Sequence, residues 1–229
     1  MIRETAEMMD CDVVEYQLEA QFRCAGSDGF VNWVDNTLGI RRTANVLWTG
    51  DEKFDFRIFA SPESLEDAIF EKDAEGFTAR MTAGFCGPWS KKINADGTLV
   101  DDVVIGDYRR PWNAQPNASR LASGIPPAHL WAYDENGKNQ IGCVYTAQGF
   151  EFDYAGVIFG TDIRYDFDTQ RWVGDKSASH DTVVKRSGDR FVDLVKNTYR
   201  VLLSRGLKGC YVCFLDRDTE RFVRSRVEG

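Results

Sequence analysis

The chain has 229 residues, of which 43% are apolar and 13% aromatic, so it suits one sizeable domain and is not disordered by composition. Its net charge of −8 and pI near 4.9 exclude a general basic coat for nucleic acid, and phosphate contacts would have to come from local arginines and lysines. There is no apolar run of the roughly 18 residues that a membrane helix needs, and no secretory signal, so we expect a cytoplasmic protein without a membrane partner.

The first part of the chain alternates between strand and helix patterns. The helices are recognised by apolar residues on one face, and the second also by Ser61-Pro62, which is typical of an N-cap followed by proline in the first turn. The expected elements are a strand at 13–18, a helix that Ser27 or Asp28 caps and that ends before Gly39, a strand at 54–60, a helix from 62 to 75 and a strand at 78–85.

The stretch from about 87 to 136 has a different character. It contains every proline except Pro62, together with Trp89, Trp112 and Trp131. Asn94-Ala-Asp-Gly97 is a good hairpin turn. We expect an irregular insertion or long hairpin region within a single domain that spans 1–229, and the three tryptophans argue against disorder.

Regular patterns return after residue 138. In order, we expect a strand at 141–145, a turn or short helix at 148–153, a strand at 157–159, a hairpin at 163–173, a helix at 191–202, a strand at 210–215 and a charged helix at 216–227. Alternation of strands with helices predicts an α/β layer architecture with a mainly parallel sheet.

Two groups of potential metal ligands have a simpler explanation. Cys210 and Cys213 lie in a buried strand, where an offset of three residues sends them to opposite faces, so we interpret them as core residues. Asp162, Asp166 and Asp168 do not match a calcium loop and are expected to be solvated hairpin carboxylates. We therefore expect no metal site, and a metal-dependent nuclease lacks support.

The turn after the strand at 141–145 is a candidate binding site. Ligands of parallel sheets gather at the carboxyl ends of strands, where Thr146, Gln148 and Glu151 would project into a crevice. Gly149 would permit close backbone approach. The alternative is an ordinary turn with solvated polar residues.

Arginines and tryptophans supply further candidates. Arg205 ends an amphipathic run and could point out of the domain toward a triphosphate, because a guanidinium matches phosphate oxygens. Alternatively, it only interacts with the helix dipole. Arg23 also lies at the end of an expected element. Trp89, beside Lys91, could stack on bases, or the tryptophans could anchor the insertion.

Four segments in this order resemble the C-terminal half of the Schlafen-group-3-like DNA/RNA helicase family, within superfamily 1. They are Leu18 to Arg23, Ala79 to Trp89, Thr146 to Tyr154 and Asn197 to Val212.

The resemblance implies a RecA-like, three-layer α/β domain of the P-loop NTPase type, the second such domain of an ATP-driven motor. By that resemblance, Arg23 and Arg205 face the γ-phosphate of ATP across a cleft. Glu151 helps to hold the nucleotide sugar, and Thr146 and Gln148 touch the single-stranded DNA or RNA.

The sequence departs from a complete motor, because it contains no Gly-x-x-x-x-Gly-Lys-Ser/Thr loop and no Asp-Glu pair that closes an apolar strand. We therefore expect a fragment that is inactive alone and uses ATP and Mg²⁺ only together with an N-terminal P-loop domain. The alternative is a non-catalytic nucleic-acid or protein binding module derived from such a motor.

Overall fold

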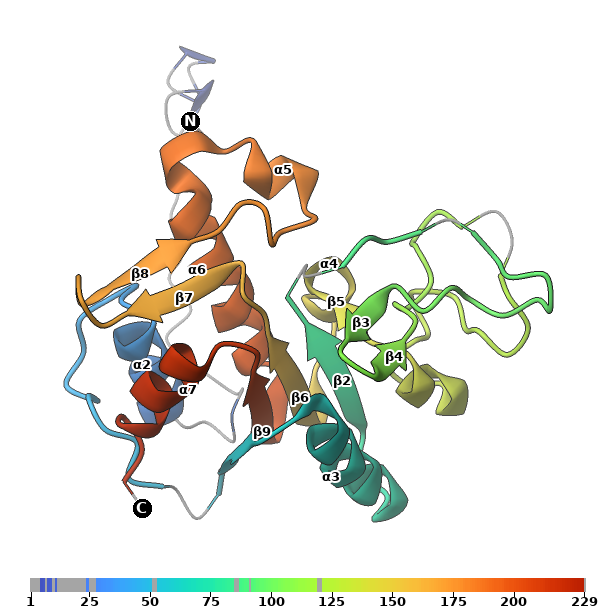
Figure 1. Cartoon of the computed structure of the whole chain (residues 1–229), viewed down its shortest axis with the longest axis horizontal. Helices are drawn as coiled ribbons and strands as arrows, with labels where there is room; N and C mark the ends of the chain where they lie inside the picture. Colours follow the sequence, from blue (N-terminus) through green and yellow to red (C-terminus); the bar gives the residue numbers. More distant parts are fainter. Residues whose placement is uncertain are drawn as a thin grey trace.

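A parallel sheet forms the middle layer of the protein (Figure 1). The computed structural model describes residues 5–6, 8–9, 11, 24, 28–50, 53–84, 87–90, 92–118 and 121–228, and the expected strand at 13–18 lies outside them. Five strands are ordered β1-β9-β6-β2-β5, and all neighbouring pairs are parallel. Their bounds are Asp55–Phe59 (β1), Gly206–Phe214 (β9), Phe152–Phe159 (β6), Ala79–Ala83 (β2) and Gly142–Cys143 (β5).

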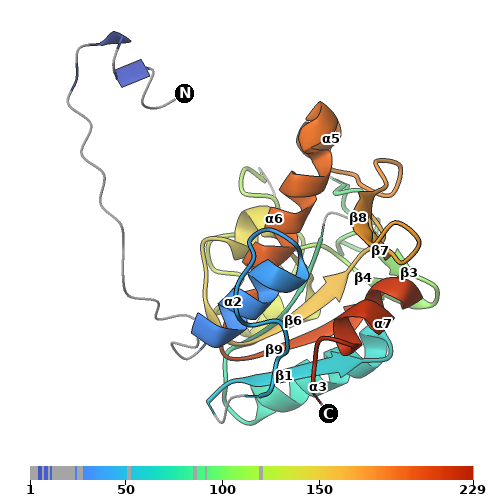
Figure 2. The same cartoon turned by 90° about the vertical axis from the view of Figure 1, so that its left-hand side faces the viewer.

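Helices cover both faces of this sheet, as the two views show (Figures 1 and 2). On one face lie α2 (Asp28–Thr37) and α6 (Phe191–Leu203), whose apolar side chains share a core with β6 and β9. On the other lies α3 (Pro62–Ala74), whose Leu65 and Ile69 pack in a second core. The expected three-layer α/β fold is confirmed.

Local sequence explains several of these elements. The Ser61 hydroxyl accepts a hydrogen bond from the Ser64 backbone N–H at 3.2 Å, which caps α3 just before Pro62. In β9, Cys210 belongs to the α2/α6 core and Cys213 to the α3 core. The interpretation of these cysteines as core residues on opposite faces is confirmed.

Tyr199 on α6 packs against the carboxyl ends of β2 and β6. Its hydroxyl donates to the Asp162 carboxylate at 2.7 Å and accepts from the Gly160 N–H at 2.9 Å. A side chain at Gly84, just after β2, would place its Cβ 2.1 Å from that hydroxyl, so only glycine leaves room for it. Asp162 is only 2% exposed, so the expectation that it is a solvated carboxylate was wrong, because Tyr199 covers it. Burial raises its pKa to about 6, against the lowering effect of the Tyr199 hydrogen bond.

The 87–136 region lies on the side of the sheet away from α2 and α7 (Figure 1). It contains a hairpin of β3 (Val103–Ile105) and β4 (Tyr108–Arg110), which packs through Val103 and Tyr108 on the α3 core, and η2 (Glu135–Asn139) follows it. Trp112 and Trp131 are fully buried, so they anchor this region against the sheet. Anchoring was one of the two expected roles of the tryptophans. Its limits as an insertion stay a prediction.

The structure differs from the sequence expectations mainly at element boundaries. The strand expected at 141–145 is only β5, because the chain turns at once into the short helix α4 (Val144–Ala147). The turn at 94–97 is flanked by one isolated bridge, Ile93 to Leu99, whereas the regular hairpin turns at Gly106.

The C-terminal part follows the expected order with longer strands. β6 and β9 each begin several residues earlier than expected. The hairpin of β7 (Ile163–Asp166) and β8 (Arg171–Gly174) and the final helix α7 (Arg217–Arg224) are confirmed. Two short helices, α5 (Thr182–Lys185) and η3 (Gly188–Arg190), were not predicted. Within the described residues, every helix is too short or too polar to cross a bilayer.

Candidate functional site

Two of the candidate segments meet at the amino-terminal edge of the sheet. Phe152 and Gly206, which begin β6 and β9, are register partners, and the Phe152 N–H donates to the Arg205 carbonyl at 3.1 Å. The turn at 148–151 and Arg205 therefore lie side by side, although they are far apart in the sequence. Gln148, Gly149 and Glu151 had been expected in a crevice at the carboxyl-terminal edge of the sheet. They lie instead at the amino-terminal edge, so the expected location was wrong.

The Arg205 side chain is turned inward. Its Nε donates to the Val201 carbonyl at 3.0 Å, and its Nη1 donates to the carbonyls of Gln148 at 3.1 Å and Phe150 at 3.4 Å. Only 4% of the residue is exposed. The expectation that it projects out of the domain was wrong, because carbonyls at the end of α6 and in the adjoining turn accept its donors. Its role toward phosphate stays a prediction.

The outer surface of the same turn is polar and exposed. Gln148, Gly149 and Glu151 are all exposed residues. A Cβ at Gly149 would meet only the Thr146 carbonyl at 3.7 Å, an ordinary contact, so the fold itself does not require glycine here. The proposed contacts of Gly149 and Glu151 with a nucleotide, and of Gln148 with a strand, stay predictions.

Asp153, in β6, contacts two neighbouring segments through its side chain. Its carboxylate accepts from the Thr78 N–H and hydroxyl, both at 3.0 Å, and pairs with Lys208 at 3.0 Å. Burial alone would raise the pKa of Asp153, but the bonds from Lys208 and Thr78 outweigh it and lower the pKa. The carboxylate thus stays charged and holds the amino-terminal edge together.

Thr146 lies elsewhere, in α4 beside the carboxyl end of β5. It is 6% exposed, and its hydroxyl accepts from the Asn113 side-chain amide at 2.9 Å. The expectation that Thr146 projects into an open crevice was wrong, because α4 packs its hydroxyl against the 87–136 region. Its contact with nucleic acid stays a prediction that this burial does not support.

Asn113 is a residue that the sequence pattern did not reveal. Its Oδ1 accepts from the Cys143 N–H at 3.2 Å, while its Nδ2 donates to Thr146 and to the Ala114 carbonyl at 2.9 Å each. It therefore ties the insertion to β5 and α4. A single asparagine in an irregular stretch carries no periodic signal that could have indicated this role.

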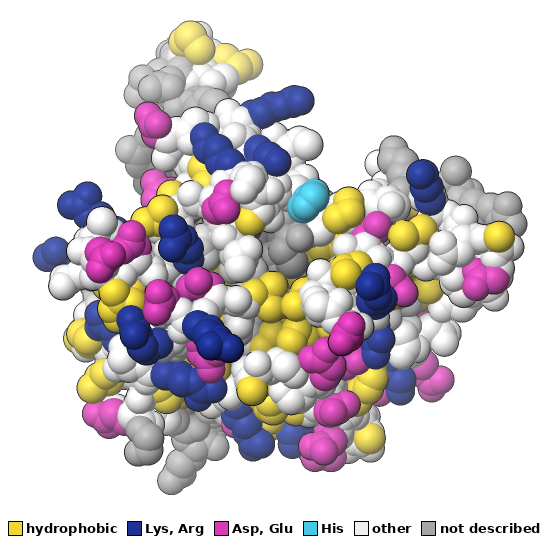
Figure 3. Space-filling view, viewed as in Figure 1, with side chains coloured by type: hydrophobic (Ala, Val, Ile, Leu, Met, Phe, Trp, Pro, Cys, Tyr) yellow, Lys and Arg dark blue, Asp and Glu magenta, His cyan; other side chains and the backbone are white. Residues whose placement is uncertain are grey.

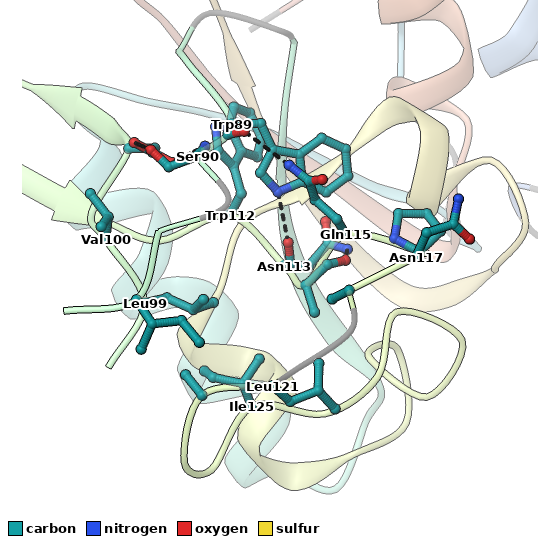
Figure 4. A pocket seen from close by; sticks show the side chains of 16 residues that line it. Trp89, Ser90, Leu99, Val100, Trp112, Asn113, Gln115, Asn117, Leu121 and Ile125 are labelled. Atoms are coloured by element: carbon teal, nitrogen blue, oxygen red, sulfur yellow. Dashed lines mark hydrogen bonds between the residues drawn. The ribbon is translucent and has the colours of Figure 1, made fainter. Parts of the chain in front are cut away.

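Trp89 is half-buried at the edge of a pocket of about 530 Å³ within the 87–136 region (Figure 4). Its Nε1 donates to the Asn113 carbonyl at 3.0 Å. Its contact with nucleic acid stays a prediction. Two other candidates, Lys91 and Arg23, lie outside the described residues.

Arg200 of α6 and Asp166 of the β7–β8 hairpin both have structural partners. Arg200 pairs with the buried Asp35, so it links α6 to α2. The Asp166 carboxylate accepts from the N–H groups of Asp168 and Thr169 in its own turn, at 2.9 and 3.2 Å. Within the part of the chain that the structure describes, no group of three or more His, Cys, Asp or Glu side chains could hold a metal ion.

Comparison with known proteins places these features in a family. The family described as "Schlafen group 3, DNA/RNA helicase domain" matches residues 1–216. A relative from Saccharomyces cerevisiae, described as "Uncharacterized protein YPL245W", is 29% identical over 234 residues, which cover 91% of this chain and 48% of the relative. The chain thus spans about half the length of this relative. No solved structure matches the chain.

Proposed function

The chain belongs to the Schlafen group 3 DNA/RNA helicase domain family, and from that premise we propose that it is the C-terminal motor domain of an ATP-dependent helicase or translocase of superfamily 1. In this proposal the domain supplies arginines and nucleic-acid contacts to a separate P-loop domain, in cis or in trans. It does not hydrolyse ATP alone, because its sequence lacks the loop that holds the phosphates.

One observation carries the proposal. The Arg205 side chain binds the carbonyls of Gln148 and Phe150, so the two segments that most resemble helicase motifs form one structural unit at one edge of the sheet. Glu151 is exposed at that unit. The buried Arg205 cation thereby fixes the turn whose exposed Glu151 carboxylate lies at a surface onto which a second domain could dock.

The residues present suit part of a nucleotide site. The planar cation of Arg205 is of the type that phosphate oxygens prefer, and the Glu151 carboxylate can accept from sugar hydroxyls. Because the described residues contain no metal cluster, Mg²⁺ would be held by the P-loop domain together with the ATP phosphates.

ATP hydrolysis measured with and without single-stranded nucleic acid tests this proposal. We expect no stimulated hydrolysis by the chain alone, and hydrolysis once a P-loop domain of the family is added. Arg205→Lys and Arg23→Ala should each lower the restored rate at least tenfold, whereas Arg221→Ala, at an exposed position on α7, should not. If the chain alone hydrolyses ATP in a strand-stimulated way and Arg205→Lys abolishes this activity, the claim that the chain is inactive alone is contradicted. If neither arginine substitution changes the restored rate, the proposed roles of Arg205 and Arg23 are contradicted.

A second candidate function is a non-catalytic module that binds single strands, favoured by the tryptophan-lined pocket in the 87–136 region. Binding of labelled single-stranded DNA and RNA over a range of salt concentrations tests it, since phosphate contacts weaken as salt rises. Strand binding combined with no ATP hydrolysis in the presence of the P-loop domain would favour this function over the motor.

A further inference from the structure

The pocket beside Trp89 is lined by two tryptophans and several aliphatic side chains. Figure 4 shows Trp89 and Trp112 on one side of it and Leu99, Leu121 and Ile125 across from them. Its volume of about 530 Å³ lies within the range of small-molecule sites, which is about 300–1,000 Å³. The pocket is thus large enough for a planar group of several rings or one ring with a sugar.

The aromatic wall is held in place by hydrogen bonds. The Trp112 Nε1 donates to the Pro88 carbonyl at 2.9 Å, the Trp89 Nε1 to the Asn113 carbonyl at 3.0 Å, and the Gln115 Nε2 to the Trp89 carbonyl at 2.9 Å. Asn113 in turn is bonded to β5 and α4. The indoles are therefore positioned by the sheet before any ligand arrives, which lowers the entropic cost of binding.

The described polar residues that line the pocket do not favour an anion. Asp102 is the charged residue among the described residues that line it, and no Lys, Arg or His is among them. Both Asp102 oxygens are used, accepting from the Ser90 N–H at 2.6 Å and the Ser90 hydroxyl at 2.9 Å. Among the described lining residues a phosphate would meet a carboxylate and no cation, so these residues favour a neutral ligand.

Two amides give the pocket a polar edge that suits a heterocycle. The Gln115 Nε2 is fixed on the Trp89 carbonyl, which leaves its Oε1 as an acceptor beside the indole. Asn117, exposed at the same pocket, can both donate and accept. Amide side chains with this capacity pair with base edges, and indole faces stack on bases of any sequence.

The charge of the whole chain points the same way. With a net charge of −8, the protein gains little general attraction for a phosphate backbone. Positive and negative side chains are mixed over the face in Figure 3 and form no continuous basic track there. Contacts to bases would therefore have to supply much of the affinity for a single strand.

We propose that this pocket captures one unstacked base of a single strand, with Trp89 as the stacking surface and Gln115 and Asn117 along the base edge. The proposal rests on the nucleic-acid contact that belongs to the proposed function. It assigns that contact to a pocket in the 87–136 region, away from the Arg205 edge of the sheet.

The test compares two fluorescent single strands of equal length and charge, an oligothymidylate and the same backbone with abasic sites. The full chain at low salt should bind the first at least several-fold more tightly. Trp89→Ala should remove that preference, about a 5- to 100-fold loss for one base–aromatic stack, whereas Trp89→Phe should retain most of it. Tyr133→Ala is the matched control, because Tyr133 is an aromatic residue of the same region, 63% exposed and outside the pocket.

A second readout protects the test against misfolding. A strand carrying one 2-aminopurine should lose fluorescence on binding when that base stacks on the indole, and the thermal midpoint of each variant shows whether it is folded. Equal affinity for both strands, or unchanged 2-aminopurine emission on a bound strand, overturns the pocket while leaving strand binding intact. Binding of the free 2-aminopurine nucleoside without strand binding overturns it too.

The outcome is separable from that of the proposed function. Hydrolysis restored by the P-loop domain depends on Arg205, which contacts no residue of the pocket in the hydrogen bonds described above. Restored hydrolysis with no base preference would refute the pocket alone. Base preference with no restored hydrolysis would refute the motor and retain the pocket.

Discussion

Arg205→Ala should destabilise the protein, because the guanidinium is part of the structure at the edge of the sheet. The substitution removes the donors to the carbonyls of Val201, Gln148 and Phe150, in a side chain that is 4% exposed. A buried acceptor left without its donor costs about 1–3 kcal/mol, while removal of the buried charge recovers part of the desolvation cost. We therefore expect the free energy of unfolding to fall by about 2–4 kcal/mol.

Urea denaturation followed by tryptophan fluorescence and far-ultraviolet circular dichroism measures this change. Arg205→Lys should fall between wild type and Arg205→Ala, because an ammonium can reach one carbonyl but cannot bridge two segments as a guanidinium fork does. Arg221→Ala is the matched control: its side chain is 65% exposed and its loss should change the stability by no more than about 0.5 kcal/mol.

The result that refutes this reasoning is a change for Arg205→Ala as small as that of the control. The turn at 148–151 would then be stable without the guanidinium, and Arg205 could leave its carbonyl partners at little cost. If Arg205→Ala instead loses much stability, a fall in its ATP hydrolysis could result from unfolding alone. Arg205→Lys is therefore the better variant for testing function.

Three further predictions concern the packing that supports the sheet. The folded pKa of Asp162, about 6, lies above the ordinary value of 3.8, so its favourable contribution is complete below about pH 4 and is lost as pH rises through 6. This loss amounts to about 3 kcal/mol. Asp162→Asn should therefore flatten the stability profile between pH 4 and 7 in urea titrations, and an unchanged slope would contradict the assignment. Gly84→Ala places a Cβ 2.1 Å from the Tyr199 hydroxyl and should lower stability by about 1–3 kcal/mol, visible as a lower thermal midpoint; no shift would mean that α6 can move away freely. Ser61→Ala removes the cap that accepts from Ser64 and should cost about 1 kcal/mol in the same assay, and a neutral result would show that Pro62 suffices to start α3.

Local rules predicted the elements that depend on neighbouring residues. Ser61-Pro62 indicated the start of α3, and the cap and the helix are both present. The spacing of Cys210 and Cys213 predicted opposite faces of a buried strand, which is what β9 shows. Side-chain period and capping act over a few residues, so the sequence contains the information needed.

The expectations of exposure were wrong for side chains whose hydrogen-bond partners lie far away in the sequence. The helix end at Arg205 and the polar turn at Gln148 were both recognised as features, but only the parallel register of β6 and β9 brings them together. The same holds for Thr146, which became buried because Asn113, from an irregular stretch with no pattern of its own, bonds to its hydroxyl.

The sequence by itself determined the α/β alternation, the family resemblance, the acidic charge and the missing P-loop, because these are properties of composition, period and motif. Tertiary structure alone decided which edge of the sheet carries the candidate residues and which of them face inward. It also formed the pocket at Trp89. The physical reason is that hydrogen-bond partners such as the Gln148 carbonyl for Arg205 are chosen by proximity in the folded sheet, which no local pattern encodes.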